Sequence, residues 1–440
     1  MKKTNNTQAI NEKVKTIPVS ERILAKGVYV NNDTHITNRN NNDLIVGPTR
    51  GGKTRGYIIP NLLRASESMI IADTKGNLYR QYGEYLAEKG YNVQCIDFKD
   101  IENTPCGYNP LDYVRKTRNP RLIKQGDRYN EQDVKKIAAI ICPIQSDKDP
   151  FWDLAAQMYL EMFILYILHN CPQKERNLST VYMLLCLMGS KEFNSVIETE
   201  LRNYPNSVFA KKYRMISQNA AAEKMEASIR GILAQHLDSI CYSTTEQMFT
   251  MKEQVDMASF LNQKTVLFLN ISDNDRSQDS LVNIFYTQAF QYLLFEADRL
   301  PDSRLPIPVR FLLDDFSTNT VIPNFDKLIS VIGSREVSVS LIVQSLSQLQ
   351  GLYFSEEAKT IINNCDHCLY LGGMDTDTAR HFSEKFNCQI STVLNLPLDS
   401  AFLFERGSAP VKVKKYYLES DGTYAELVQK RKNAAREPAV

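Results

Sequence analysis

Two kinds of hydrophobic pattern occur along the chain and divide it into regions. The first kind consists of short apolar runs separated by segments of helical periodicity, which predicts buried strands alternating with helices. The runs predict strands at 44–46, 68–73, 91–97, 265–270, 309–315, 337–344, 367–371 and 401–405. Helices are predicted between them at 53–63, 278–299, 324–333, 355–363 and 375–386. Because strands that alternate with helices form parallel sheets covered on both faces, the predicted fold class is α/β.

The second kind of pattern is helical periodicity with almost no strand signal, and it extends from Glu131 to about Phe260. It predicts helices at 131–141, 152–169, 178–187, 191–203, 218–238 and 251–261. The sheet pattern stops before this region and resumes after it. We therefore predict an all-helical domain at 126–261, inserted into an α/β domain formed by 21–125 and 262–420. Residues 1–20 are predicted to form a flexible polar arm, and residues 421–440 a charged tail.

Composition narrows the classes of protein that this chain can be. Its 440 residues provide room for two or three domains. The net charge is +1, so any contact with nucleic acid must use local basic patches. Nine scattered cysteines cannot all pair internally, which favours a reducing compartment. The polar start lacks the apolar core of a signal peptide. The most apolar run, Met158 to Leu168, is short and contains Glu161, so we expect a buried helix and no transmembrane segment.

A phosphate-binding loop follows the first predicted core strand. The segment Gly47-Pro48-Thr49-Arg50-Gly51-Gly52-Lys53-Thr54 fits the pattern G-x-x-x-x-G-K-[ST] between an apolar run and a helix. In such a loop the backbone N–H groups and the positive end of the helix face the phosphates. Lys53 would reach the β- and γ-phosphates, and the Thr54 hydroxyl would bind Mg²⁺. The predicted ligands are therefore ATP and Mg²⁺.

A partner carboxylate for the metal is predicted at the end of a later strand. Asp314 follows the apolar run Val309 to Leu313, and we expect this strand to lie next to the strand that precedes the loop. Asp315 follows directly and would polarise the attacking water.

Two further side chains have alternative interpretations. Gln344 ends the next strand, where its amide would sense the γ-phosphate or orient water, or would simply cap the following turn. Arg335 would neutralise transition-state charge in a neighbouring subunit, or would form a surface ion pair with Glu336 or another acid.

Several other groups have a structural interpretation that competes with a functional one. Asp73, Lys75 and Asp97 fall near the ligand-binding edge of the sheet, and loop capping is the alternative. Cys365 and Cys368 would point to opposite faces of a strand, which argues against a shared metal. Trp152 is expected to be a core or domain-joint residue rather than a base-stacking platform. The cluster Lys211-Lys212-Tyr213-Arg214 contacts phosphate or forms a solvated face.

The ordered set of motifs resembles the coupling ATPases of type IV secretion and conjugation systems, the TraG/TraD-like proteins. The resemblance extends from about Leu24 to Tyr417. The motifs that carry it are Arg39-Asn40-Asn41-Asn42, Gly47 to Thr54, Ile71-Ala72-Asp73-Thr74-Lys75-Gly76, Tyr108-Asn109-Pro110-Leu111, Phe151-Trp152 to Ala156, Leu312-Leu313-Asp314-Asp315-Phe316, Ile322-Pro323-Asn324-Phe325, Ser334-Arg335-Glu336, Gln344-Ser345-Leu346-Ser347-Gln348-Leu349, Asn364-Cys365-Asp366 and Leu371-Gly372-Gly373.

The resemblance implies a RecA-like motor domain that carries an all-helical domain and assembles into a hexameric ring with ATP sites between subunits. It implies delivery of relaxase-bound single-stranded DNA, or of effector proteins, to a secretion channel. It also supports Arg335 as a finger acting across the interface and Gln344 as a sensor.

The chain departs from the family pattern in two respects. Family members usually start with membrane-spanning helices, whereas none is expected in this chain. The expected location is therefore the cytoplasmic face of the bacterial membrane, with a separate membrane-anchor protein as partner. The family usually has Asp-Glu where this chain has Asp314-Asp315. The shorter acid leaves open a nucleotide-gated docking protein with little hydrolysis. A small-molecule kinase is less favoured, because no second substrate-pocket pattern is present.

Overall fold

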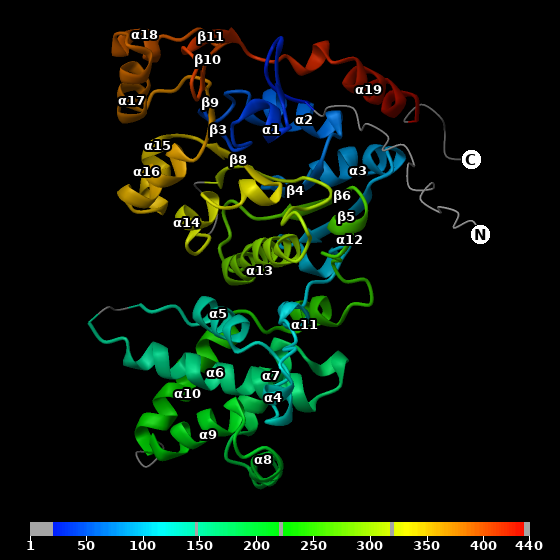
Figure 1. Cartoon of the computed structure of the whole chain (residues 1–440), viewed down its shortest axis with the longest axis vertical. Helices are drawn as coiled ribbons and strands as arrows, with labels where there is room; N and C mark the ends of the chain where they lie inside the picture. The colour runs from blue at the N-terminus through cyan, green and yellow to red at the C-terminus, as the bar shows by residue number, and fades with distance from the viewer. Residues whose placement is uncertain (1–20, 146–147, 220–222, 317–320, 435–440) are drawn as a thin grey trace, which may run out of the picture.

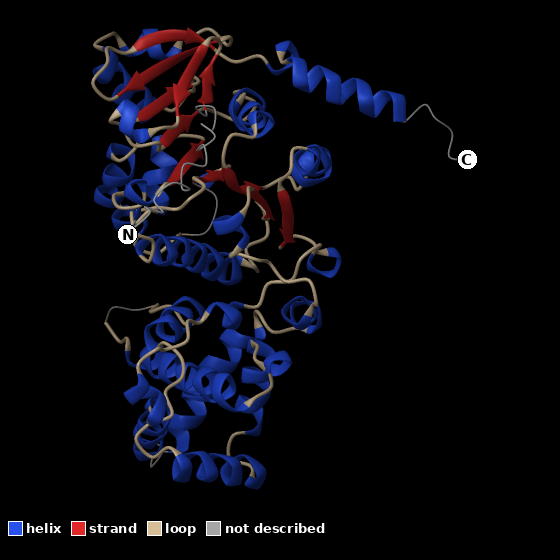
Figure 2. Ribbon diagram, turned by 45° about the vertical axis from the view of Figure 1, so that its right-hand side comes forward, coloured by secondary structure: helices blue, strands red, loops and turns tan. Residues whose placement is uncertain are grey.

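The computed structural model describes residues 21–145, 148–219, 223–316 and 321–434, so the predicted arm at 1–20 lies outside the described residues. Two parts are visible, with a sheet and its helices above and a group of helices below (Figure 1). All strands of the described chain belong to the upper part, as the colouring by secondary structure shows (Figure 2). This arrangement fits the predicted insertion, although the domain boundaries themselves stay a prediction.

The upper part is built on a nine-stranded sheet of order β11-β10-β9-β3-β8-β7-β4-β6-β5. The strands are β3 (Asp43–Val46), β4 (Ser68–Asp73), β5 (Asn92–Asp97), β6 (Thr265–Asn270), β7 (Val309–Leu313), β8 (Val337–Val343), β9 (His367–Tyr370), β10 (Ser400–Glu405) and β11 (Val411–Lys414). The strands from β9 to β5 are parallel to their neighbours, and β10 and β11 add an antiparallel edge. The α/β class is confirmed. Strand β11 was not predicted.

The order of the central strands differs from the prediction. Strand β7, which precedes Asp314, was expected beside β3, but β8 lies between them and pairs with both. This expectation was wrong because an apolar run shows that a strand is buried without specifying its neighbour. As a result, Gln344 at the end of β8 lies between the phosphate-binding loop and Asp314 along the sheet edge.

Both faces of the sheet are covered, and side chains alternate between two apolar clusters. Leu44 and Val46 belong to one cluster and Ile45 to the other, as expected for period-two strands. The first face packs against α13 (Asp279–Asp298), α14 (Phe325–Ile329), α15 (Leu346–Leu352), α16 (Ser355–Asn363) and α17 (Thr376–Phe386). The second face packs against η1 (Thr54–Ile58), α2 (Ile59–Arg64) and α3 (Leu78–Glu88).

A buried charge cluster anchors the strand that leads into the loop. Asp43 at the start of β3 accepts hydrogen bonds from the Arg22 guanidinium at 2.7 and 2.9 Å, and the Arg310 guanidinium lies 3.3 Å away. Burial alone would raise the pKa of Asp43, but Arg22 and the other cations hold it well below its usual range. Tyr57, just after the loop, donates its hydroxyl to Asp43 at 2.5 Å. The segments before and after the loop are therefore tied to one buried group.

Among the residues that the structure describes, the secondary structure of the lower part is helical. The helices are α4 (Pro120–Lys124), α5 (Glu131–Ile141), α6 (Phe151–Asn170), α7 (Leu178–Leu187), α8 (Lys191–Asn203), α9 (Val208–Asn219), α10 (Glu223–Asp238) and α11 (Ser243–Thr250), with α12 (Ser259–Asn262) leading back to the sheet. Helices α4 and α9 were not predicted. The predicted helix at 251–261 is wrong over 251–258, although its end falls in α12. Val255 donates its N–H to the carbonyl of Gly107 at 2.9 Å, and the Gly107 N–H donates to the carbonyl of Glu253. That bridge uses backbone groups that a helix would need.

Helix α6 forms the centre of the lower part (Figure 1). Among the described helices it is the one that is long and apolar enough to cross a membrane, and 72% of its most apolar 18-residue window is buried inside the fold. That degree of burial fits the predicted core helix. Trp152, near its start, is partly buried against the apolar cluster, as predicted for a core residue.

Short elements complete the fold. They are β1 (Glu21–Ala25), β2 (Val28–Asn31), α1 (Thr34–Thr37) and α18 (Ile390–Leu394). Within the predicted charged tail, residues 422–434 form α19 (Gly422–Ala434), a helix that the sequence analysis did not predict. Its charged side chains contact α3, since Lys430 bonds Glu88 at 2.5 Å and the Arg431 guanidinium lies over the Tyr82 ring.

Candidate nucleotide-binding site

The predicted phosphate-binding residues form one continuous loop between β3 and η1. Within it the Gly51 N–H donates to the carbonyl of Pro48 at 2.9 Å. Gly52 adopts a φ of +97°, which favours glycine. A Cβ on Gly47 would lie 2.8 Å from the Cβ of Leu371, so only glycine allows β9 to approach this closely. The exposed middle of the loop consists of Pro48, Thr49 and Arg50.

Lys53 folds back across the loop that it belongs to. Its Nζ donates to the carbonyl of Gly47 at 3.0 Å and lies 3.3 Å from Oδ1 of Asp315. The side chain is only 7% exposed. These contacts hold the ammonium group at the mouth of the loop, where this geometry would bring it to the terminal phosphates of a nucleotide.

Thr54 and Asp314 come together as predicted for a metal-binding pair. The Thr54 hydroxyl donates to Oδ2 of Asp314 at 3.1 Å. Burial, and then the neighbouring charge of Asp315, raise the pKa of Asp314 to about 6. Hydroxyl and carboxylate oxygens are the donors that Mg²⁺ prefers. The positive charge of a bound metal would favour the ionised carboxylate, so these two residues fit the predicted ion.

Asp315 and Gln344 meet at the carboxyl ends of β7 and β8. The amide Nε2 of Gln344 lies 3.5 Å from Oδ1 of Asp315. Asp315 has a φ of +48°, a left-handed conformation that Asp tolerates better than most residues. The turn-capping alternative for Gln344 is not supported, because Ser345 caps α15 by accepting the Gln348 N–H at 3.2 Å. Gln344 is therefore available to act beside Asp315.

Arg335 lies at the opposite end of the sheet from the loop. It precedes β8, so the seven residues of that strand separate it from Gln344 by about 23 Å at 3.3 Å per residue. Its guanidinium bonds Asp298 at 2.8 Å, whereas Glu336 pairs with Arg304. Within this chain Arg335 therefore forms the surface ion pair that was the alternative to a finger role, with another acid, Asp298, as its partner. Arg335 does not reach the loop of its own chain.

Lys415 is a site residue that the sequence analysis missed. Its Nζ donates to the carbonyl of Gly51 at 3.0 Å and to that of Leu371 at 2.8 Å. Burial lowers the pKa of this ammonium group. Lys415 follows β11 and lies 364 positions after Gly51, so no local pattern connects the two.

A cavity of about 990 Å³ adjoins this side of the loop. Apolar side chains from three later segments line it beside the loop residues, among them Leu371, Met374, Leu396, Leu398 and Tyr416. Apolar walls next to a phosphate-binding loop suit a base and ribose.

We expect Lys415→Ala to weaken nucleotide binding about tenfold, because Lys415 fixes the Gly51 carbonyl and with it the direction of the loop N–H groups. Titration with a fluorescent ATP analogue measures the affinity. The matched control is Lys412→Ala, since exposed Lys412 lies on the same strand, β11, and is not among the residues that line this cavity. Equal affinities for the two variants would contradict this role.

The remaining predicted groups have structural roles. Asp73 accepts the Lys75 N–H at 3.0 Å, and Asp97 accepts the Lys99 N–H at 2.9 Å, as in the loop-capping interpretation. In the basic cluster, Lys211 and Arg214 are exposed, as in the solvated-face interpretation, whereas Lys212 pairs with Glu161 at 2.5 Å and is largely buried.

Comparison with known proteins identifies similar sequences and folds. A family model described as Type IV secretory system Conjugative DNA transfer matches residues 2–387. The protein VirD4 of Rhizobium radiobacter is 24% identical over 90% of this chain, and the conjugal transfer protein TraG of Escherichia coli is 22% identical over 78%. The chain spans 59% and 54% of those two relatives.

A solved structure of the plasmid coupling protein TrwB in complex with ADP and Mg²⁺ aligns with a TM-score of 0.65 at 15% identity. The alignment covers 90% of this chain and 88% of that one. At this identity the similarity concerns the fold, and it confirms the predicted RecA-like architecture.

Proposed function

Because the chain belongs to the family of type IV secretory system conjugative DNA transfer proteins, we propose that it is a coupling ATPase, which binds ATP and Mg²⁺ and delivers substrate to a transfer channel. The observation that carries the proposal is the convergence of Lys53, Thr54, Asp314 and Asp315 at one loop. The ADP and Mg²⁺ of the TrwB complex support the same ligands.

The residues divide the chemistry of phosphoryl transfer between them. The loop N–H groups and Lys53 hold the phosphates, and Thr54 with Asp314 would hold Mg²⁺, which neutralises phosphate charge when bound. Asp315 would accept a proton from the attacking water, and the Gln344 amide beside it would orient that water. Lys53 has to leave Asp315 to meet the terminal phosphate, which frees the carboxylate for this task.

The assembly and its partners follow from Arg335 and from the family. An arginine that cannot reach its own loop would act on the loop of a neighbouring subunit, which supports a ring, and the proposed ring is a homo-hexamer. The proposed substrates are relaxase-bound single-stranded DNA or effector proteins. The ring would dock on the cytoplasmic face of the bacterial membrane beside the secretion channel and a membrane-anchor partner.

The test of this function is steady-state ATP hydrolysis by the purified chain, with and without single-stranded DNA. Mg²⁺-dependent turnover that rises with DNA is expected for a DNA-linked motor. ATP turnover that does not change when single-stranded DNA is added would indicate that the substrate is a protein. A chain that fails to bind ATP would contradict the proposal as a whole.

Asp315→Glu is expected to raise turnover on the order of a hundredfold. Asp is one methylene shorter than Glu and holds its carboxylate about an ångström farther from the water. A displacement of this size is enough to lower the rate of hydrolysis on the order of a hundredfold. The assay compares kcat of the two proteins under saturating ATP. Turnover that stays equal or falls in the variant would show that Asp315 is already an adequate base.

The same comparison tests the second candidate, a nucleotide-gated docking protein that binds ATP with little hydrolysis. It is favoured by the shorter acid and by the 3.3 Å ion pair that holds Asp315 to Lys53. A wild-type chain that binds ATP without turnover, beside an active Asp315→Glu variant, would select this alternative.

A further inference from the structure

A strongly basic segment connects the sheet to the helical part. Residues 115–128 carry six basic side chains and a single acid, whereas the whole chain has a net charge of +1. The single acid, Asp127, is buried and accepts the Val208 N–H, so it does not offset the exposed cations. This concentration of charge lay in a stretch that the hydrophobic pattern left irregular, and the phosphate-binding loop makes no use of it.

Four of these cations, Lys116, Arg118, Arg121 and Lys124, are exposed within nine residues of chain, and we call this segment the strip. Within the described ranges of the chain, no ion pair joins any of the four to an acid, whereas Arg115 beside them is paired with Asp133 at 2.7 Å. Unpaired cations in a row attract a polyanion, because each phosphate that they neutralise releases a counterion.

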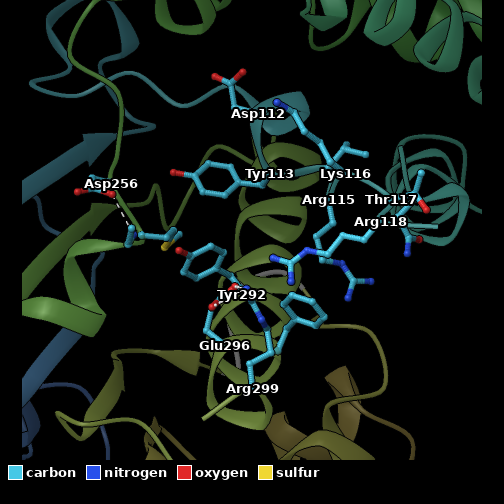
Figure 3. Close-up of a pocket in the computed structure, with 15 residues that line it drawn as sticks. Asp112, Tyr113, Arg115, Lys116, Thr117, Arg118, Asp256, Tyr292, Glu296 and Arg299 are labelled. Carbon is cyan, nitrogen blue, oxygen red and sulfur yellow. Dashed lines mark hydrogen bonds and ion pairs between the residues drawn. The ribbon is translucent and has the colours of Figure 1, made fainter. Parts of the chain in front are cut away.

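The strip begins at a cavity of about 830 Å³ between the two parts of the molecule. Tyr113 and Tyr292 of α13 lie side by side in it, with ring centroids 6.4 Å apart (Figure 3). Phe295 of α13 also lines the cavity. Phe295 is 36% exposed, with the Arg115 guanidinium 4.6 Å and that of Arg299 5.6 Å from its ring centre. Aromatic rings and guanidinium planes are surfaces on which unpaired bases stack.

The cavity also contains carboxylates, and they limit what it can bind. Asp112, Asp256 and Glu296 border it, with Glu296 paired to Arg299 at 2.9 Å. Carboxylates repel phosphates but accept hydrogen bonds from base amino groups. A ligand that fits both the strip and the cavity therefore carries phosphates, which would contact the strip, and rings with amino groups, which would enter the cavity. An anionic lipid surface or an acidic peptide satisfies only the strip.

We propose that the strip and the cavity bind single-stranded nucleic acid, with phosphates along Lys116, Arg118, Arg121 and Lys124 and a base against Phe295. This inference rests on the proposed function, because it names the place where the substrate strand is held. Helix α13 also packs on β7, the strand just before Asp314, since Phe290 stacks on Phe311 with ring centroids 4.0 Å apart.

The experiment is fluorescence anisotropy of a labelled single-stranded oligonucleotide titrated with the full chain at several salt concentrations. The double variant Lys116→Glu, Arg118→Glu is expected to bind at least tenfold more weakly. It is also expected to lower the slope of log affinity against log salt by about 1.4, since each phosphate contact on a single strand contributes about 0.7. Phe295→Ala is expected to weaken binding about tenfold with an unchanged slope, because stacking involves no counterions.

The matched control is Lys211→Glu, Arg214→Glu, which makes the same charge change on exposed cations of α9. Equal losses in this control and in the strip variant would overturn the proposal, because the effect would then be general electrostatics. Binding to vesicles of anionic lipid but not to the oligonucleotide would overturn it as well.

ATP turnover without DNA is measured in parallel. DNA binding at the strip without ATP turnover would refute only the proposed ATPase activity. ATP turnover without DNA binding at the strip would refute only this DNA-binding site.

Discussion

Arg335→Ala is expected to lower ATP turnover by a factor of about 10³ to 10⁵ while leaving nucleotide affinity nearly unchanged, since an arginine finger acts on transition-state charge. Arg335 lies across the sheet from its own loop and is held by Asp298 at 2.8 Å, so we propose that it acts on the loop of a neighbouring subunit. Turnover under saturating ATP and binding of a fluorescent ATP analogue measure the two effects separately. A variant that keeps its turnover would remove Arg335 from the site.

Action between subunits is tested by mixing two inactive chains. In a ring that contains Arg335→Ala and Lys53→Ala subunits, some interfaces combine an intact loop from the first with an intact arginine from the second. Random assembly of equal amounts makes about a quarter of the interfaces complete, so a mixture is expected to recover activity that neither variant has. A mixture that remains as inactive as its components would contradict action in trans.

Lys53→Ala is expected to abolish measurable turnover, with a loss on the order of 10³-fold or more, and to weaken ATP binding. Lys53 is 7% exposed and its ammonium group lies 3.0 Å from the Gly47 carbonyl, so it would meet a phosphate in a site from which water is largely excluded. Charge stabilisation is strongest in such surroundings. Nucleotide titration and steady-state hydrolysis measure the two losses.

The control for this variant is Lys89→Ala, which removes an exposed lysine at the end of α3, remote from the loop. A Lys53→Ala protein that hydrolyses ATP like this control would refute the assignment of the whole loop. Loss of binding in both variants would point to damage of the fold rather than of the site, and thermal melting distinguishes that outcome.

Local patterns were sufficient for much of the site. The loop at 47–54, its strand and its helix are contiguous in the chain, so their spacing alone predicted them. Asp314 and Asp315 were found because an apolar run that ends in two acids is also a local signal. The limits of the helices at 131–141, 178–187 and 191–203 were predicted correctly, since each has its own periodicity and N-terminal cap.

The failures share one cause, which is that the deciding contact joins residues far apart in the chain. The helix expected at 251–261 gave way over 251–258 to a backbone bridge with Gly107, and residues 422–434 of the expected tail form a helix that contacts α3. In both cases tertiary contacts overrode a local preference, which is worth only tenths of a kilocalorie per mole per residue.

The sequence by itself determined the α/β class, the phosphate-binding loop with Lys53 and Thr54, and the acids that complete it, because these depend on spacing over a few residues. The tertiary structure alone decided that β8 lies between β3 and β7, that Gln344 therefore meets Asp315, and that Lys415 supports the loop from a distance of 364 positions. Strand order and long-range hydrogen bonds depend on the packing of the whole chain, and no local segment records which distant partner it will meet.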